Sequence, residues 1–128
     1  MSGMKSRRKG HDYERQIRRE YRELGWSNCE TSRFASKMMD DRKIDLVNTK
    51  PFAVQCKSLI NNPSYHKIFK EMEADKDDYK IIYHKRKNDG EYVIMEKDDF
   101  HELVEMLIYH KIFSIWNTYQ IKLEKKIY

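Results

Sequence analysis

Apolar side chains recur at helical spacing near the start of the chain and alternate with polar side chains farther along. Tyr13, Ile17, Tyr21 and Leu24 lie three or four residues apart, and Gly25 follows them. Residues at these steps share one face of a helix, and glycine is common just beyond a helix end. The pattern therefore predicts a first helix that ends near Gly25 and buries one apolar stripe.

Shorter segments with strand-like alternation follow this helix. We expect a strand over 26–32, a polar mobile loop over 33–42, and two further strands over 44–48 and 52–57. The intervening Thr49-Lys50-Pro51 favours a turn. The last two strands are therefore predicted to pair as an antiparallel hairpin.

The middle of the chain predicts a helix and a second hairpin. A loop over 59–64 contains Asn61-Asn62-Pro63 and precedes a helix over 65–72. Strands over 80–86 and 92–96 flank Asn88-Asp89-Gly90, a strong turn signal. Together these elements predict an α/β protein whose central mixed β-sheet is flanked by helices.

The last third of the chain predicts an apolar helical region over about 98–123. Its large apolar residues recur at steps of three and four. They are Phe100, Leu103, Val104, Leu107, Ile108, Ile112, Ile115, Trp116 and Tyr119. Packing against the sheet would explain some of them, but their number favours a partner surface, most simply a two-fold homodimer.

Length and charge indicate one small domain with an anionic partner. The chain has 128 residues and a net charge of +5, which suits a single core. Lys and Arg outnumber Asp and Glu by four in the first 24 residues. We therefore expect a basic flexible arm over 1–10, followed by a single domain over 11–128. Such an arm either contacts phosphates or merely solubilises the chain.

Three polar side chains are predicted to share one face of the first hairpin. If its turn centres on Lys50, Asp45 lies opposite Gln55, and Lys57 returns to the same face two residues later. The other face is apolar and carries Val54 and Cys56, together with Phe52, Ile44 and Leu46. Such a pair of strands buries one face and leaves polar groups on the other.

The order Glu14, Asp45 and Gln55-x-Lys57 resembles the PD-(D/E)xK nuclease superfamily. The Lys9-Gly10-x-x-x-Glu14 opening is similar to that of archaeal-type Holliday junction resolvases, and Val54-Gln55-Cys56-Lys57 resembles Mrr-type restriction endonucleases. The resemblance covers roughly residues 9–58. It implies a restriction-endonuclease-like fold and catalytic roles for Glu14, Asp45, Gln55 and Lys57. Ile44 stands where the superfamily name has proline, and Gln55 replaces an acid.

Phosphodiester hydrolysis explains why these residue types matter. The reaction needs an activated water and positive charge on the phosphoryl oxygens. Mg²⁺ prefers oxygen ligands and keeps several waters, so one or two carboxylates suffice. Asp45, Gln55, Glu14 and the Cys56 backbone carbonyl are the predicted ligands, with Mn²⁺ as a substitute. Lys57 is expected to position the attacking water or to stabilise the phosphate.

Basic and small polar residues around this motif are predicted to contact DNA, either a four-way junction or other branched DNA. They are Arg7, Arg8, Lys9, Arg15, Arg18, Arg19, Arg33, Ser36, Lys37 and Arg42. Ser36 corresponds to a serine near the active site of the resolvases, with Ser32 as the alternative. A dimer would place two sites at a fixed separation, as symmetric cutting of a junction requires.

Other readings of the sequence remain open. A Mrr-like restriction or repair endonuclease is the alternative enzyme, and a DNA-binding module with a degraded site at Gln55 is the alternative without catalysis. Cys29 and Cys56 lack the spacing of zinc ligands, and the five histidines form no metal motif. No apolar run approaches 18 residues, so we expect an intracellular protein without a membrane span.

Overall fold

A computed structural model describes residues 2–112 and 125. The chain divides into two compact units, Met1–Met95 and Glu96–Tyr128. This division differs from the single domain predicted over 11–128, because close contacts of the chain fall mainly within one unit or the other. No helix among the described residues is both long and apolar enough to cross a membrane.

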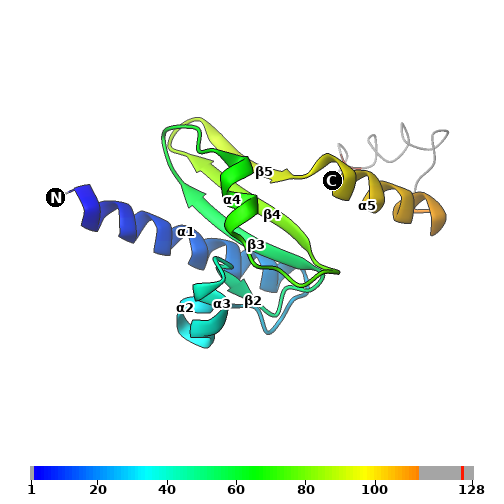
Figure 1. Ribbon diagram of the computed structural model, residues 1–128, viewed down its shortest axis with the longest axis horizontal. Coiled ribbons are helices and arrows are strands. Elements are labelled where there is room, and N and C mark those ends of the chain that lie inside the picture. The colour runs from blue at the N-terminus through cyan, green and yellow to red at the C-terminus, as the bar shows by residue number, and fades with distance from the viewer. Residues whose placement is uncertain (1, 113–124, 126–128) are drawn as a thin grey trace. The chain divides into compact units, whose positions relative to one another are not determined.

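The first unit is a mixed α/β structure (Figure 1). Its elements, in order, are α1 (Ser2–Leu24), β1 (Glu30–Thr31), α2 (Ser32–Ala35), α3 (Lys37–Asp41), β2 (Leu46–Val47), β3 (Phe52–Ser58), α4 (Tyr65–Glu71), β4 (Tyr79–Arg86) and β5 (Gly90–Met95). The second unit contains α5 (Lys97–Tyr109). The predicted helical region over 98–123 extends past Ile112, and its residues 113–123, including Trp116, lie outside the described residues.

The central sheet has the strand order β3-β4-β5. Strands β3 and β4 are parallel, and α4 lies in the connection between them. Strands β4 and β5 are antiparallel and form a hairpin in which Asn88 and Gly90 both have positive φ angles. The predicted mixed sheet, the helix over 65–72 and the second hairpin are confirmed.

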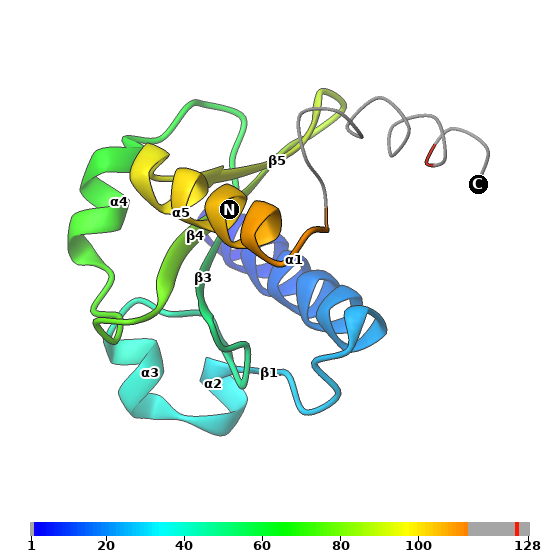
Figure 2. The same cartoon turned by 90° about the vertical axis from the view of Figure 1, so that its right-hand side faces the viewer.

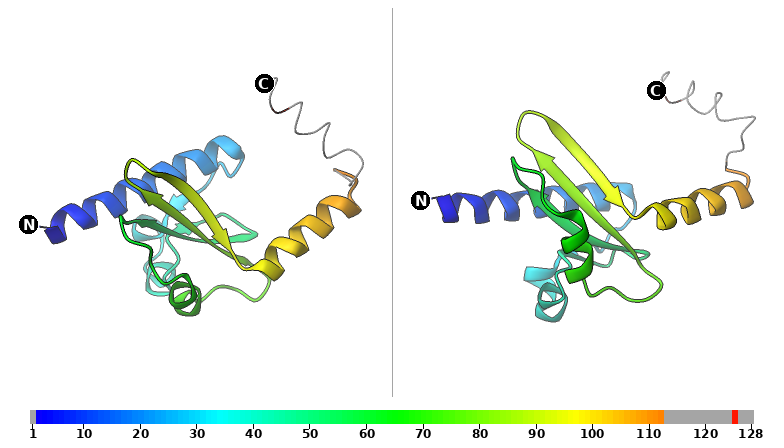
Figure 3. Two further views of the ribbon diagram at one scale, coloured as in Figure 1. Left: turned by 90° about the horizontal axis from the view of Figure 1, so that it is seen from above. Right: turned by 45° about the horizontal axis from the view of Figure 1, so that its top comes forward.

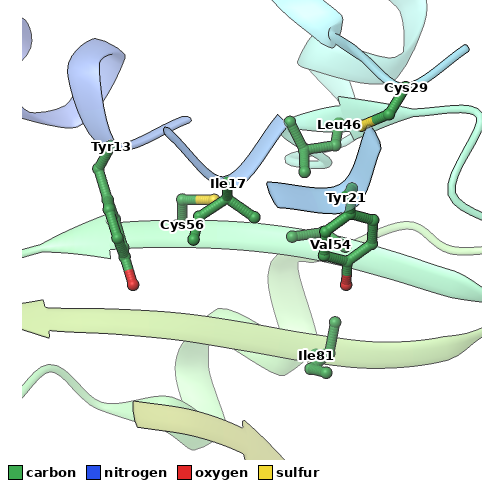
Figure 4. Close-up of a cluster of buried hydrophobic side chains, with 8 residues drawn as sticks. All are labelled: Tyr13, Ile17, Tyr21, Cys29, Leu46, Val54, Cys56 and Ile81. Carbon is green, nitrogen blue, oxygen red and sulfur yellow. The ribbon is translucent and has the colours of Figure 1, made fainter. Parts of the chain in front are cut away.

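Helices cover both faces of this sheet (Figures 2 and 3). The stripe of α1, with Tyr13, Ile17 and Tyr21, packs on Val54 and Cys56 of β3 (Figure 4). This cluster also contains Cys29, Leu46 and Ile81. Because side chains alternate along a strand, residues between those of the first cluster face the other way, and α4 covers them. That second cluster consists of Ile44, Ala53, Ile68, Phe69, Met72 and Ile82.

Three predictions about local structure are wrong. Within the segment predicted as a flexible arm over 1–10, residues 2–10 are helical and belong to α1, because the segment contains no proline and is rich in residues that favour helix. The loop predicted over 33–42 forms α2 and α3, the latter capped by the Ser36 side chain. The strand predicted over 26–32 is reduced to two residues.

The predicted hairpin between 44–48 and 52–57 is also wrong. Strand β2 pairs with β1, in the register Glu30 with Val47, and lies in a separate two-stranded sheet. Asn48, with φ 62°, turns the chain directly after β2. Ile44 packs in the α4-side core and not, as predicted, beside Val54. Strand β3 has seven residues and already pairs with β4. It therefore contacts residues 44–48 only locally and not as a partner strand.

Substituting Tyr65 by Phe tests a buried polar contact that ties the loop after β3 to the sheet. His84 is 1% exposed, with Nε2 3.1 Å from the Leu59 carbonyl oxygen and Nδ1 2.9 Å from the Tyr65 hydroxyl. Because a carbonyl only accepts, Nε2 carries the proton and Nδ1 accepts from Tyr65. Loss of this donor should lower the free energy of unfolding by about 1–3 kcal/mol.

Urea denaturation measures this loss, with Tyr92→Phe as the matched control because the Tyr92 side chain is exposed. Equal unfolding midpoints for the two variants would show that the His84 contact contributes nothing to stability.

Candidate active site

Asp45 lies where the small sheet meets the edge of β3. Its backbone N–H donates to the Val54 carbonyl over 2.8 Å, and its own carbonyl accepts from the Ser32 N–H over 2.8 Å. These two bonds tie β3 to the start of α2 through a single residue. Asp45 is only 8% exposed, so its carboxylate is held in the interior by backbone on both sides.

The environment of the Asp45 carboxylate opposes its ionisation. Burial raises the pKa of Asp45 to about 7, and the charge of Glu14 raises it further; the Cys56 N–H and the charge of Lys57 act in the opposite direction. The Cys56 N–H donates to Oδ2 over 2.7 Å. The negative charge of Asp40 on α3 also raises the pKa of Asp45, by a smaller amount. A nearby cation would relieve this cost, because it favours the charged form.

Glu14 reaches the same region from α1. It lies beside the buried stripe, between Tyr13 and Ile17, and is 9% exposed. Its Oε2 accepts a hydrogen bond of 3.0 Å from Nε of Arg33. The structure pairs Arg33, a residue that is predicted to contact DNA, with Glu14. The guanidinium therefore neutralises one of the two carboxylates that approach each other here.

Gln55 and Lys57 come from β3 itself. Gln55 is 8% exposed, and its Oε1 accepts no hydrogen bond from any described residue. A buried amide oxygen without a donor is costly, so such an atom is a candidate ligand for a cation. The positive charge of Lys57 lowers the pKa of Asp45. Gln55 lies between Val54 and Cys56, which bond to Asp45, although β3 forms no hairpin with the segment of Asp45.

The geometry that brings these groups together differs from the predicted one. Asp45 was expected directly opposite Gln55 in a strand pair. Instead, its N–H bonds to Val54 and its side chain bonds to Cys56, so that it flanks Gln55 without a regular ladder. The Cys56 thiol is buried, and burial raises its pKa. What Cys56 contributes here is its backbone, because a buried neutral thiol is a poor nucleophile.

The donor set fits a hard divalent cation better than zinc. Two carboxylates and an amide oxygen are ligands that Mg²⁺ accepts, with water completing its shell. Within residues 2–112 and 125, no group of three or more His, Cys, Asp or Glu side chains stands within metal-binding reach.

Several basic residues predicted to contact DNA are engaged in ion pairs. Arg15 pairs with Asp12 at 2.7 Å. Arg18 pairs with Glu30 at 2.6 Å, and the hydrogen bond from this arginine lowers the pKa of Glu30. The pairing of Arg18 joins α1 to β1. These arginines therefore have a structural role besides any contact with a ligand.

Other predicted basic residues are free to bind a ligand. They are exposed and have no carboxylate partner among the described residues. They are Arg7, Arg8, Lys9, Arg19 and Lys37. Arg42 ends α3, and its carbonyl accepts from the Glu73 N–H over 2.9 Å. The free cations lie mainly along α1.

The structure separates the two candidate serines. Ser32 is fully buried beside Asp45, and its Oγ has no partner among the described residues. The Ser36 hydroxyl accepts a hydrogen bond from the Met39 N–H at the start of α3. Ser36 lines a hollow that Asp45 does not line. Ser32 was predicted as the alternative to Ser36, whereas Asp40 was missing from the predicted site because nothing in its local sequence marks it. Only the folding of α2 and α3 next to Asp45 brings them close.

Searches against protein-family models, curated proteins and solved structures each found no match to this chain.

Asp45→Asn should stabilise the protein at high pH. In the unfolded chain this acid ionises near its ordinary pKa of 3.8, whereas in the native protein burial raises the pKa to about 7. Between these values stability falls as pH rises, and above them the loss is constant. Asparagine keeps an acceptor for the Cys56 N–H without the charge. The gain should approach about 4 kcal/mol at about pH 8 and vanish near pH 4.

Urea denaturation across this pH range measures the difference, with Asp41→Asn as the control because Asp41 is exposed at the end of α3. If Asp45→Asn and the natural chain were equally stable at about pH 8, ionisation of the buried Asp45 carboxylate would not destabilise the protein.

Proposed function

We propose that this protein is a metal-dependent DNA endonuclease selective for branched structures, most simply a Holliday junction resolvase. The observation that carries the proposal is the buried Asp45 carboxylate, whose pKa is raised to about 7 by burial and by the charge of Glu14. Gln55, whose amide oxygen has no donor among the described residues, lies between the two β3 residues that bond to Asp45. A mixed sheet with α1 on one face agrees with the restriction-endonuclease-like fold that we propose for it.

Asp45, Glu14, Gln55 and the Cys56 carbonyl would hold Mg²⁺, with Mn²⁺ as a substitute. When bound, the ion supplies positive charge to the phosphoryl oxygens and acidifies a water. Asp45 enters the reaction as a carboxylate, which the Cys56 N–H already favours. Lys57 orients the attacking water or stabilises the phosphate. Arg33 must loosen its contact with Glu14 for that carboxylate to act.

The free cations of α1 and α3 would bind the phosphate backbone in a salt-dependent way that does not depend on base sequence. We further propose that α5 provides a homodimer interface, since its apolar residues recur at helical steps and none of them is buried. A two-fold dimer would present two equivalent sites, which suits paired incisions in a four-way junction.

One observation favours a second function, a DNA-binding module without catalysis. Glu14 is already paired with Arg33, and Gln55 carries no charge. If the ion pair persists in the presence of Mg²⁺, only Asp45 remains as a charged ligand. The basic surface of α1 would then bind DNA while the phosphodiester stays intact.

Cleavage of a synthetic four-way junction and of its matched linear duplex separates these functions. With Mg²⁺, the natural chain should make paired symmetric nicks in the junction alone. Asp45→Asn should reduce the cleavage rate at least about a hundredfold while DNA binding persists, because the main cation ligand loses its charge. Asp41→Asn, on exposed α3, is the control and should cleave normally.

Cleavage that survives chelator or Asp45→Asn would contradict the proposed site. Equal cutting of the duplex would favour a Mrr-like endonuclease, and binding without cutting would favour the DNA-binding module.

Arg19→Gln should weaken DNA binding without changing the fold. Arg19 is exposed on α1 and lines a shallow hollow with three other arginines. Removing one phosphate contact should reduce the slope of log affinity against log salt concentration by about one. Fluorescence anisotropy at several salt concentrations measures it.

Lys70→Gln is the matched control, because Lys70 is exposed on α4, which covers the opposite face of the sheet. Equal slopes for both variants would place the DNA on another surface.

A further inference from the structure

A second hollow lies between α1 and the ends of the central strands. Its volume is about 270 Å³. The residues that line it are Lys9, Asp12, Tyr13, Gln16, Ser58, Lys85 and Lys87. None of these belongs to the candidate metal site. Tyr13 is the sequence neighbour of Glu14 on α1, but successive helical residues point about 100° apart. Ser58 is the neighbour of Lys57 on β3, but successive strand residues point to opposite faces. The hollow is therefore separate from the candidate metal site.

The charge of this hollow is positive. Lys9, Lys85 and Lys87 have no ion pair among the described residues. The carboxylate of Asp12 is paired with Arg15 at 2.7 Å and is thereby neutralised. Two further acids, Glu91 and Glu20, lie near Tyr13. Glu91 stands opposite Lys85 on β5 and accepts a hydrogen bond from Gln16 over 3.0 Å. Three ammonium groups therefore meet two further carboxylates, Glu91 and Glu20, and the balance stays positive.

Hydrogen-bond donors also outnumber acceptors in the hollow. The buried Tyr13 hydroxyl makes no well-formed hydrogen bond with any described residue, although the Glu91 carboxylate lies close enough to interact with it. Burial and the nearby charge of Glu91 raise the pKa of Tyr13, so the hydroxyl keeps its proton. Figure 4 shows its ring extending from α1 across β3 toward β4. Lys85 Nζ lies 5.7 Å from the centre of this ring and donates a long hydrogen bond of 3.4 Å to Gln16 Oε1. An anion with several oxygens would satisfy these groups.

An adjoining hollow indicates what could carry such an anion. It shares Lys9 and Ser58 with the first hollow and continues along the loop after β3. Leu59 and Ile60 of this loop are exposed, with 41% and 65% of their surface accessible, and they line it together with Pro63. A basic cavity therefore opens beside an apolar shelf, an arrangement that suits a phosphate attached to a less polar group.

We propose that the hollow formed by Lys9, Tyr13, Lys85 and Lys87 is a binding site for a phosphate monoester. Lysines act as point charges for phosphate, and the tyrosine hydroxyl donates a directional hydrogen bond. The ligand is inorganic phosphate, a nucleoside monophosphate or the phosphorylated end of a nucleic-acid strand, which share this chemistry. The site does not depend on the nuclease proposal, since it uses none of Glu14, Asp45, Gln55 or Lys57.

Calorimetric titration of the full chain tests the site with four probes. These are inorganic phosphate, thymidine 5′-monophosphate, a 5′-phosphorylated tetranucleotide and the same tetranucleotide with a 5′-hydroxyl. The phosphorylated tetranucleotide should bind at least roughly tenfold more tightly than its hydroxyl form, because only the monoester carries the second charge. The relative affinities of the three phosphate probes identify the carrier.

Variants connect this binding to the hollow. Lys85→Gln with Lys87→Gln should weaken all three phosphate probes at least roughly tenfold, and Tyr13→Phe should weaken them several-fold by removing only a hydroxyl. Lys76→Gln is the control, since Lys76 is exposed and lies outside the hollow. Unfolding midpoints in urea verify that each variant is folded.

Equal binding of the phosphorylated and hydroxyl tetranucleotides, or affinity unchanged by the double lysine variant, would overturn the proposal. Repeating the titrations in Asp45→Asn keeps the two proposals apart. Phosphate binding should be unchanged in that variant. A protein without nuclease activity could therefore still bind phosphate monoesters, and a nuclease could lack this binding.

Discussion

The burial of the Asp45 carboxylate is the constraint on which the arrangement of the first unit depends. One edge of β3 pairs with β4, and the other meets Asp45 through one backbone hydrogen bond and one from Cys56 to the side chain. The carboxylate thus replaces part of a missing strand ladder. This satisfies the backbone of β3, but it leaves a charge in the interior beside Glu14. Such an imbalance would be relieved by a bound cation, as we propose.

Helix α1 links this site to the rest of the unit. Its buried stripe packs on the sheet, while Glu14 on one flank meets Arg33 and Lys85 approaches Tyr13 on the other. Arg18 binds Glu30 and so holds β1 against the helix. One helix therefore positions an acidic cluster and a basic hollow on separate sides. The same stripe that stabilises the fold keeps the two proposed ligand sites apart.

Elements whose signals are local could be predicted from the sequence. The stripe of α1, the helix after Ser64 and the hairpin around Asn88-Asp89-Gly90 are confirmed, because spacing, capping and turn residues agree there. The hairpin expected between 44–48 and 52–57 is wrong, because β2 pairs with β1. Competition between two possible partner strands is not visible in either segment alone.

The sequence by itself determined which chemical groups are available to the candidate site: two acids, an amide and an amine, in Glu14, Asp45, Gln55 and Lys57. It also determined which residues of α1 enter the core, since helical periodicity is a local property. Only the tertiary structure decided that Arg33 neutralises Glu14 and that the Gln55 amide oxygen has no donor among the described residues. Those contacts join residues far apart along the chain, and their energies depend on burial that arises only when the helices and strands pack together.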